Sequence, residues 1–302
     1  MKLDNGVLHL SAAFKQYPHT EKLMRGEITV PGLHLDCLDI EPIHRAFAPM
    51  ARTQAYDVSE MAIVTYLQAK AYGKSLIMLP TVLAARLQQG CIVYNKRRDP
   101  LGVIDMPGAR VGVRAYTQTT GMWVRAILDQ TYGVPAEKIE WITFEGGHLQ
   151  EYQDPAFVTR APAGKEMLQM LLDGELDAAV FGNDLPSHED IAPLIPDHVA
   201  ADKLWHEQHG FVPYNHIAVM HRAVAEARPD SVRAVYSLLR QGKDAVADPI
   251  ALRKRVPDGL EAMRGPLEQI IGFCERQQLM PRKIGVDEIF ADCLHYLGAD
   301  AY

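Results

Sequence analysis

Short apolar runs alternate, along the first 61 residues, with stretches in which apolar residues recur every three or four positions. The runs predict strands at 7–14, 33–40 and 56–61, and the stretches between them predict helices at 18–26 and 42–53. Because strands separated by helices form βαβ units, this order predicts a parallel sheet covered by helices.

A second series of the same kind follows a predicted turn at Pro107 and Gly108. It predicts strands and helices in alternation at 110–113, 121–133, 139–144, 164–175 and 176–182. Two series in one chain indicate two lobes. We expect residues 1–104 to form the first lobe, 105–211 the second, and 212–302 a return crossing with helices that pack on the first lobe.

An α/β protein with two lobes and two crossings is expected to hold a ligand cleft between the lobes. The carboxyl ends of the strands meet there, and such sheets bind their ligands at that edge. The polar residues at the strand ends are therefore the candidates for binding and chemistry.

Composition narrows the class of protein. The 302 residues are 48% hydrophobic and carry a formal net charge of −7, with lysine and arginine scattered, so no nucleic-acid-binding face is predicted. The four cysteines lie far apart without CxxC spacing, and reduced thiols are expected. No stretch approaches the ~20 apolar residues of a membrane span, and no signal peptide is evident, so a cytoplasmic location is expected.

The loop after the strand at 110–113 carries a candidate anion site. Arg114 ends the strand, and the hydroxyls of Thr117, Thr119 and Thr120 lie where the next helix begins. Free amide groups at a helix N-terminus attract a carboxylate or phosphate. The alternative is that Thr119 or Thr120 simply caps the helix. Further along, Asn183 follows the strand at 176–182 and is a second candidate contact.

Histidine is abundant, with 12 residues, yet its spacing does not predict a metal centre. His206 and His209 lie three residues apart, whereas paired ligands on a helix usually lie four apart with a third ligand elsewhere. His216 differs because it interrupts an apolar strand. It is either a buried histidine that holds a hinge or a general acid, for which its ordinary pKa near neutrality is suited.

Ser59 and Glu60 make the strand at 56–61 polar near its end, where the next helix begins. Glu60 is either a first-turn glutamate favoured by the helix dipole or a partly buried carboxylate in the cleft, placed for proton transfer or for orienting His216.

Several segments resemble the 4,5-dihydroxyphthalate decarboxylase family. They include YDVSEMAIVTYL at 56–67, GARVGVRAYTQTTGMWVRAIL at 108–128, GFVPYNHIAVM at 210–220 and CERQQLMPRKIGVDEIFAD at 274–292. The resemblance implies a type II periplasmic-binding-protein-like fold. It also implies that Glu60 and His216 lie in the active cleft and that the loop from Tyr116 to Thr120 contacts the substrate.

Two positions depart from the family pattern. His19 stands where an arginine is usual, and the segment after Pro80 holds the single Arg86 in place of an arginine- and histidine-rich stretch. Both remain candidate substrate contacts. The loss of cationic groups indicates either a substrate with fewer carboxylates than a phthalate or a changed function.

The resemblance implies a decarboxylase of a hydroxylated aromatic carboxylic acid and, by analogy, a homo-oligomer. No organic cofactor is expected, since the sequence shows no motif for one, and no metal site is predicted. The remaining alternatives are a small-molecule binding protein without catalysis and another lyase or dehydratase on the same fold, because fold alone does not fix function.

Overall fold

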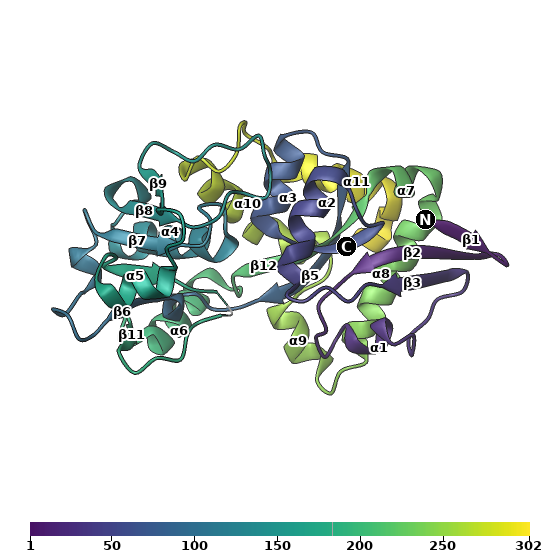
Figure 1. Ribbon diagram of the computed structural model, residues 1–302. Helices are drawn as coiled ribbons and strands as arrows, with labels where there is room; N and C mark the ends of the chain where they lie inside the picture. The colour runs from purple at the N-terminus through teal and green to yellow at the C-terminus, as the bar shows by residue number, and fades with distance from the viewer. Residues whose placement is uncertain (183) are drawn as a thin grey trace. The chain divides into compact units, whose positions relative to one another are not determined.

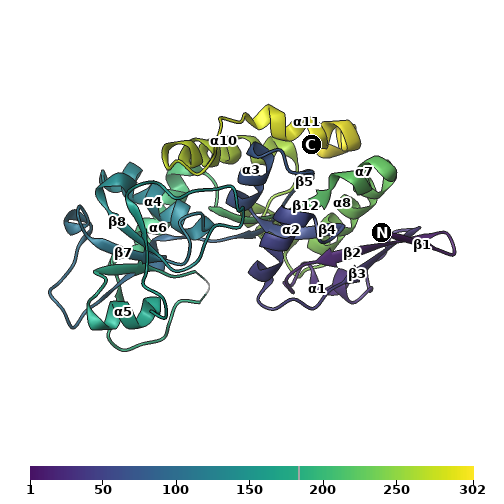
Figure 2. The same cartoon turned by 45° about the horizontal axis from the view of Figure 1, so that its top comes forward.

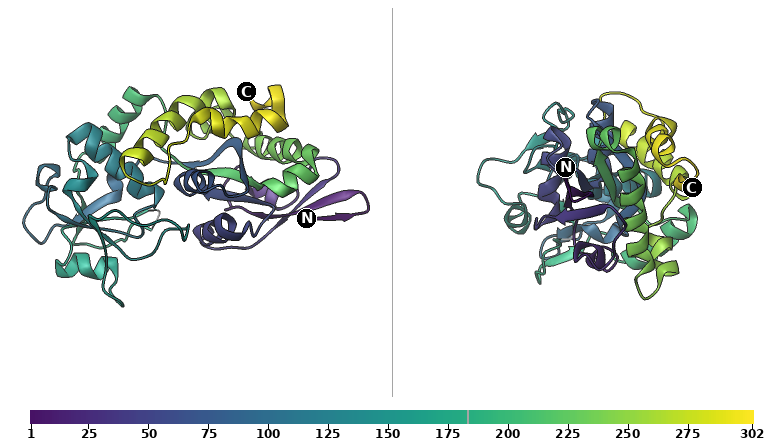
Figure 3. Two further views of the ribbon diagram at one scale, coloured as in Figure 1. Left: turned by 90° about the horizontal axis from the view of Figure 1, so that it is seen from above. Right: turned by 90° about the vertical axis from the view of Figure 1, so that its right-hand side faces the viewer.

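A computed structural model describes residues 1–182 and 184–302. Contacts within the chain divide it into two compact units (Figure 1). Unit 1 consists of Met1–Arg86, Tyr214–Gly272 and Met280–Tyr302, and unit 2 of Leu87–Pro213 and Phe273–Leu279. Both termini lie in unit 1 (Figure 3).

The sheet of unit 1 has six strands in the order β1-β2-β4-β12-β5, with β3 paired to β2. Their bounds are β1 Lys2–Asp4, β2 Val7–Ala13, β3 Leu33–Cys37, β4 Val58–Ala62, β5 Leu76–Ala85 and β12 Tyr214–His221. Strand β2 runs parallel to β3 and β4, whereas β12 is antiparallel to both β4 and β5.

Helices surround this sheet, and the central strands are buried on both faces. The helices are α1 Glu21–Met24, α2 Phe47–Thr53, α3 Ile63–Ala71, α7 Arg222–Ala227, α8 Pro229–Asp244, α9 Pro249–Arg255, α10 Leu260–Arg276 and α11 Val286–Leu297. Helices α8 and α11 pack on β5 (Figure 2). Every residue of β4 is buried, which is why a polar side chain on that strand needs partners from the protein.

The sheet of unit 2 has the order β11-β6-β10-β7-β8-β9. Its elements are β6 Ile92–Asn95, β7 Arg110–Val113, α4 Thr119–Tyr132, β8 Glu140–Thr143, β9 Val158–Arg160, α5 Met167–Asp173, β10 Ala178–Val180, β11 Ile191–Pro193 and α6 His198–His209. Strands β7, β8, β9 and β10 run parallel, and β6 and β11 pair antiparallel.

The prediction of a parallel sheet was therefore only partly right, because both sheets are mixed. In unit 1, β1 runs antiparallel to β2, and β12 runs antiparallel to β4 and β5, which lie far from it along the chain. In unit 2, β6 runs antiparallel to both of its neighbours, β10 and β11. Because β6 pairs with β10, the contacts assign it to unit 2, whereas the sequence analysis ended the first lobe at residue 104.

The described part of the chain contains no helix of the length and apolar character that a membrane span needs.

Candidate functional site

Glu60 and His216 meet on one face of the unit 1 sheet. Glu60 is paired in register with Ala218, and His216 with Ala62, on the neighbouring antiparallel strand. Residues two apart on a strand point to the same face, so the two side chains are diagonal neighbours. The Nδ1 atom of His216 lies 2.5 Å from Oε1 of Glu60.

The carboxylate of Glu60 is fully buried and accepts hydrogen bonds from three groups. Tyr17 donates its hydroxyl to Oε1 at 2.7 Å, and the backbone amide of Lys15 donates to Oε2 at 2.9 Å. His216 supplies the third donor. The first two donors lie in the β2–α1 loop, just after the carboxyl end of β2, so the fold brings two chain segments, this loop and β12, to one carboxylate of β4.

These contacts fix the protonation of the cluster. Burial acts to raise the pKa of Glu60, but the hydrogen bond and charge of His216, with the donors Lys15 and Tyr17, outweigh it and hold the pKa below its ordinary value of 4.5. Burial and the neighbouring carboxylate raise the pKa of Tyr17 well above its usual range. Glu60 is thus a carboxylate and Tyr17 a neutral phenol that donates to it.

His216 has one nitrogen left for chemistry. The Nδ1–H group of His216 donates to the carboxylate of Glu60. The other ring nitrogen, Nε2, then has no partner among the described residues. Phe47 packs edge-on against the ring, with centroids 5.0 Å apart. The side chain is 16% exposed, whereas Glu60 is closed off. His216 is therefore the member of the pair that a ligand can reach.

His19 lies beside this cluster, stacked on Tyr17 with ring centroids 5.1 Å apart. Its Nε2 donates to the carbonyl of Leu83 on β5 at 3.1 Å, which leaves Nδ1 as an unpaired acceptor. Burial, and next the charge of Lys243, lower the pKa of His19 to about 4. His19 is therefore neutral near pH 7, unlike the arginine that the family pattern has at this position.

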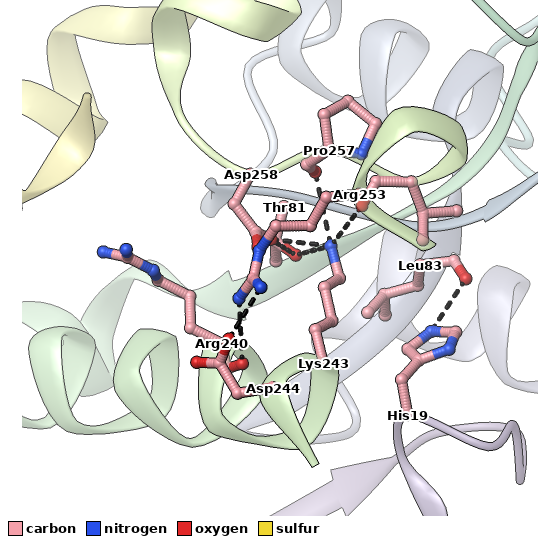
Figure 4. Close-up of polar contacts among 10 residues, drawn as sticks. His19, Thr81, Leu83, Arg240, Lys243, Asp244, Arg253, Pro257 and Asp258 are labelled. Carbon is pink, nitrogen blue, oxygen red and sulfur yellow. Dashed lines mark hydrogen bonds and ion pairs between the residues drawn. The ribbon is translucent and has the colours of Figure 1, made fainter. Parts of the chain in front are cut away.

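Lys243 on α8 is the source of that charge and is itself fully buried. Figure 4 shows its polar contacts. Its Nζ lies 2.6 Å from Asp258 and 2.8 Å from both Thr81 Oγ1 and the carbonyl of Val256. Burial lowers the pKa of Lys243 to about 8, against the opposing effect of Asp258. With every donor engaged, Lys243 ties α8 to β5 and to the loop before α10.

Two further cations lie near Tyr17 in unit 1. The ammonium of Lys15 is 5.6 Å from the centre of the Tyr17 ring and forms no ion pair within the described part of the chain. Arg86 follows β5 directly and lies close enough to Tyr17 to act on its pKa, which it lowers against the larger effect of burial. The ammonium of Lys15 and the guanidinium of Arg86 are both cations of the type that binds the carboxylate of a ligand.

The side chain of Ser59 does not join the side chains of Glu60 and His216. It points to the opposite face of β4, is fully buried, and donates its hydroxyl to the backbone carbonyl of Glu60 at 2.6 Å. The interpretation of Glu60 as a first-turn helix residue was wrong, because β4 continues to Ala62 and α3 begins at Ile63. The polar stretch is the middle of a buried strand.

The other predicted contacts lie in unit 2. Arg114 is near Glu145, with Nε 3.9 Å from Oε2. Tyr116 is buried, and the guanidinium of Arg125 lies 3.9 Å from the centre of its ring. Thr117 is also buried and close to Gly147, where a Cβ atom would lie 3.4 Å from Oγ1.

Thr119 and Thr120 are the first two residues of α4, and both are buried. The capping alternative was wrong, since Gln118 is the residue that precedes the first turn and no side chain caps it. Asn183 lies outside the described residues.

His206 and His209 both lie on α6, where the ring of His209 stacks on Trp205 at 4.1 Å. His221 ends β12.

Sequence reasoning missed Lys15, Tyr17 and Lys243. The loop AFKQYPHT directly follows the first strand, and strand ends were already singled out as candidate sites, so that signal existed for the first two. Lys243 gave no signal, because a lysine near the end of an amphipathic helix normally faces water.

Comparisons with known proteins identify related sequences. The chain is 29% identical over 241 residues to a 4,5-dihydroxyphthalate decarboxylase of Comamonas testosteroni, covering 74% of this chain and 71% of that protein. It is 29% identical over 212 residues to one of Pseudomonas putida, covering 66% and 81%. No family model matches the chain.

Solved structures are similar in fold. The alkanesulfonate-binding protein SsuA of Xanthomonas axonopodis aligns over 95% of this chain and 99% of its own, with a TM-score of 0.57 and 13% identity. The desulfurization enzyme DSZB aligns over 93% and 95%, with a TM-score of 0.55 and 13% identity. The fold is therefore that of the two-lobed periplasmic binding proteins, and solved structures of this fold include a binding protein and an enzyme.

Proposed function

We propose that this chain, a divergent relative of the 4,5-dihydroxyphthalate decarboxylases, catalyses the non-oxidative decarboxylation of a hydroxylated aromatic acid. The observation that carries the proposal is the contact between the buried carboxylate of Glu60 and Nδ1 of His216. A solute-binding protein does not need a buried carboxylate that orients a histidine, whereas a proton-transfer reaction does.

The reaction needs one proton at one carbon. A hydroxyl group ortho or para to the carboxylate donates electron density to the ring carbon that bears the carboxylate. The proton from Nε2 of His216 forms the new C–H bond, the C–C bond to the carboxylate breaks, and its electron pair restores the aromatic ring as carbon dioxide leaves. A proton taken up from the solvent then restores the protonated ring of His216, so one proton is consumed in each turnover.

Glu60 is a positioning residue in this scheme. All three of its hydrogen bonds come from the protein, and it is fully buried, so it acts on the substrate through His216. It holds the ring so that Nε2 faces outward, and it stabilises the positive charge that the ring carries while protonated. We therefore assign the role of the acid to His216.

The substrate carboxylate is best held by the cations near Tyr17, namely Lys15 and Arg86. The neutral ring of His19 offers a lone pair where a cation would be needed for a second carboxylate. We therefore favour a hydroxybenzoate with a single carboxylate over a phthalate. We also propose that no organic cofactor or metal takes part in the reaction; the cytoplasmic location and the homo-oligomeric state remain predictions.

The first experiment is an assay of carbon dioxide release from a panel of hydroxybenzoates and hydroxyphthalates. We expect turnover with an ortho- or para-hydroxylated acid and none with the matching meta isomer. If the purified protein releases no carbon dioxide from any member of the panel, the proposal fails.

A variant separates catalysis from binding. His216→Asn keeps a polar side chain of similar reach but cannot deliver a proton, so turnover should fall by roughly 10²- to 10⁴-fold. Binding of the same acid, measured by calorimetry, should change little. A variant with undiminished turnover would remove His216 from the mechanism, and a pure binding protein would have no turnover to lose.

A further inference from the structure

Strands β2 and β3 run parallel, and β2 also forms the N-terminal hairpin with β1 (Figure 2). Three side chains of types that can ligate a metal lie together on the outer face of β2 and β3. His9 is paired in register with His34, and Asp36 follows two residues later on the same face of β3. One ligand atom from each residue lies within 4.8 Å of the other two.

The distances fit a single ion. Asp36 Oδ1 lies 3.2 Å from Nδ1 of His9 and 3.6 Å from Nε2 of His34. Ligands about 2.0–2.1 Å from a tetrahedral zinc ion are separated by roughly 3.3 Å from one another. These two separations lie on either side of that value, and the ligand nitrogens of the two histidines lie within 4.8 Å of each other.

A hydrogen bond accounts for only one of these contacts. The contact from His9 to Asp36 is within hydrogen-bond range, whereas the 3.6 Å from His34 is beyond it. No other hydrogen bond holds the His34 ring within the described residues, yet its Nε2 faces the same carboxylate oxygen. The two rings also contact each other, with centroids 5.0 Å apart, so a cation bound at this oxygen would be within reach of both.

The backbone that carries the three ligands is fixed. Leu8, Leu10, Leu33 and Leu35 project from the opposite face of the same strands and are buried in the core. The ligand side chains are between 29% and 51% exposed, so they can adjust and leave positions open for water. Lys2, opposite His9 on β1, is exposed and is free to turn its charge into solvent.

We propose that His9, His34 and Asp36 form a surface site for a divalent transition metal, with Zn²⁺, Co²⁺ and Ni²⁺ as the chemical class. Two imidazoles and one carboxylate, with water completing the shell, suit these borderline ions better than Mg²⁺ or Ca²⁺. The ion joins β3 to β2. The site is independent of the proposed decarboxylation, since none of its residues contacts Glu60 or His216.

The test uses the full chain without a histidine tag, stripped with a chelator and titrated with Zn²⁺ by calorimetry and with Co²⁺ by visible absorption. We expect one equivalent to bind, with a rise in the melting temperature. His34→Ala and His9→Ala should each weaken binding by roughly tenfold or more, because loss of even an outer-shell partner costs 10–100-fold.

The matched control is His188→Ala, which removes an exposed histidine beside a single aspartate, Asp190. It should leave the affinity unchanged. Carbon dioxide release by His34→Ala should equal that of the wild type, so failure here and failure of the proposed function are distinguishable. Equal affinity in His34→Ala and wild type, or equal weakening by His188→Ala, would show only nonspecific surface binding and overturn the site.

Discussion

Glu60 is the residue on which the arrangement of the site depends. Its carboxylate accepts hydrogen bonds from a phenol and an amide of the β2–α1 loop and from an imidazole of β12. A buried charge of this kind is tolerated only when its hydrogen-bonding capacity is filled. The residue therefore couples the geometry of His216 to the path of the β2–α1 loop.

Glu60→Gln tests this coupling. The amide keeps the shape but removes the charge, and its NH₂ group competes with the donors that the carboxylate accepted. We expect kcat to fall by roughly 10²- to 10⁴-fold with little change in KM. Glu261→Gln, an exposed glutamate on α10, is the matched control and should be as active as the wild type.

The same residue predicts an effect of pH on stability. The pKa of Glu60 is lower in the folded chain than its ordinary value of 4.5, so the unfolded state binds the proton more readily. Its contribution to the free energy of unfolding is present above that value and is lost as the pH falls through the folded pKa. Urea unfolding from about pH 6 to about pH 3 should show a steeper loss for the wild type than for Glu60→Gln. Parallel curves for the two proteins would contradict the lowered pKa.

At the scale of elements, α8 does more than cover the sheet. Lys243 anchors it to β5, and the preceding Gly242 lets it approach the loop that holds His19. A Cβ atom at position 242 would lie 2.3 Å from the carbonyl oxygen of His19, a distance that real contacts do not reach. The helix thus sets the position of the loop that supplies Lys15 and Tyr17.

Gly242→Ala should therefore weaken the protein, although alanine is the better helix former by about 1 kcal/mol. The backbone at His19 must shift, and we expect a lower melting temperature together with reduced carbon dioxide release. Gly265→Ala on α10 is the control, because open space surrounds the added Cβ atom there. A Gly242→Ala protein as stable and active as Gly265→Ala would show that the loop is not held by this contact.

Local patterns predicted many of the elements but not their pairing. The strand at 110–113 and the helix that follows were visible because their apolar spacing is local, and the structure has them as β7 and α4. The strand β5 at Leu76–Ala85 was not predicted, since its almost continuous apolar run, broken by Pro80, has no period to identify it. The insertion of β12 between β4 and β5 is a tertiary event that no local pattern carries.

The same limit applies to the site. Glu60 and His216 were both predicted as candidate site residues, because each is a polar residue within a predicted strand. Tyr17 and Lys15 complete the set of donors to the Glu60 carboxylate only because of the path that the β2–α1 loop takes. The types of the residues alone do not predict that path. Ser59 was chosen for its place beside Glu60, but the alternation of a strand turns it to the other face.

At the scale of the molecule, unit 2 is built from two distant parts of the chain. The short segment Phe273–Leu279 belongs to it, and Gln277 accepts a hydrogen bond at 2.7 Å from the buried guanidinium of Arg125. The amide of Gln277 also donates to the carbonyl of Met122 at 3.0 Å. Phe273 packs edge-on against Trp123 in the same unit.

Gln277→Ala should destabilise the protein by about 1–3 kcal/mol, because the Nε of Arg125 is left buried without an acceptor. The free energy of unfolding in urea measures the loss, and Gln241→Ala, an exposed glutamine on α8, should change it by less than about 0.5 kcal/mol. Equal values for the two variants would mean that water replaces the lost acceptor.

The ion pair of Lys243 also has a consequence for sequence comparison. Its partners Thr81 and Asp258 are 162 and 15 residues away along the chain. Replacement of any of these three residues would leave a buried charge or hydroxyl of the others without its partner and without contact to water. Among descendants of a common ancestor these three positions should therefore change together or not at all. A homologue that keeps the glutamate and histidine but lacks this trio is expected to carry a differently shaped β2–α1 loop, and with it a different preference for substrate.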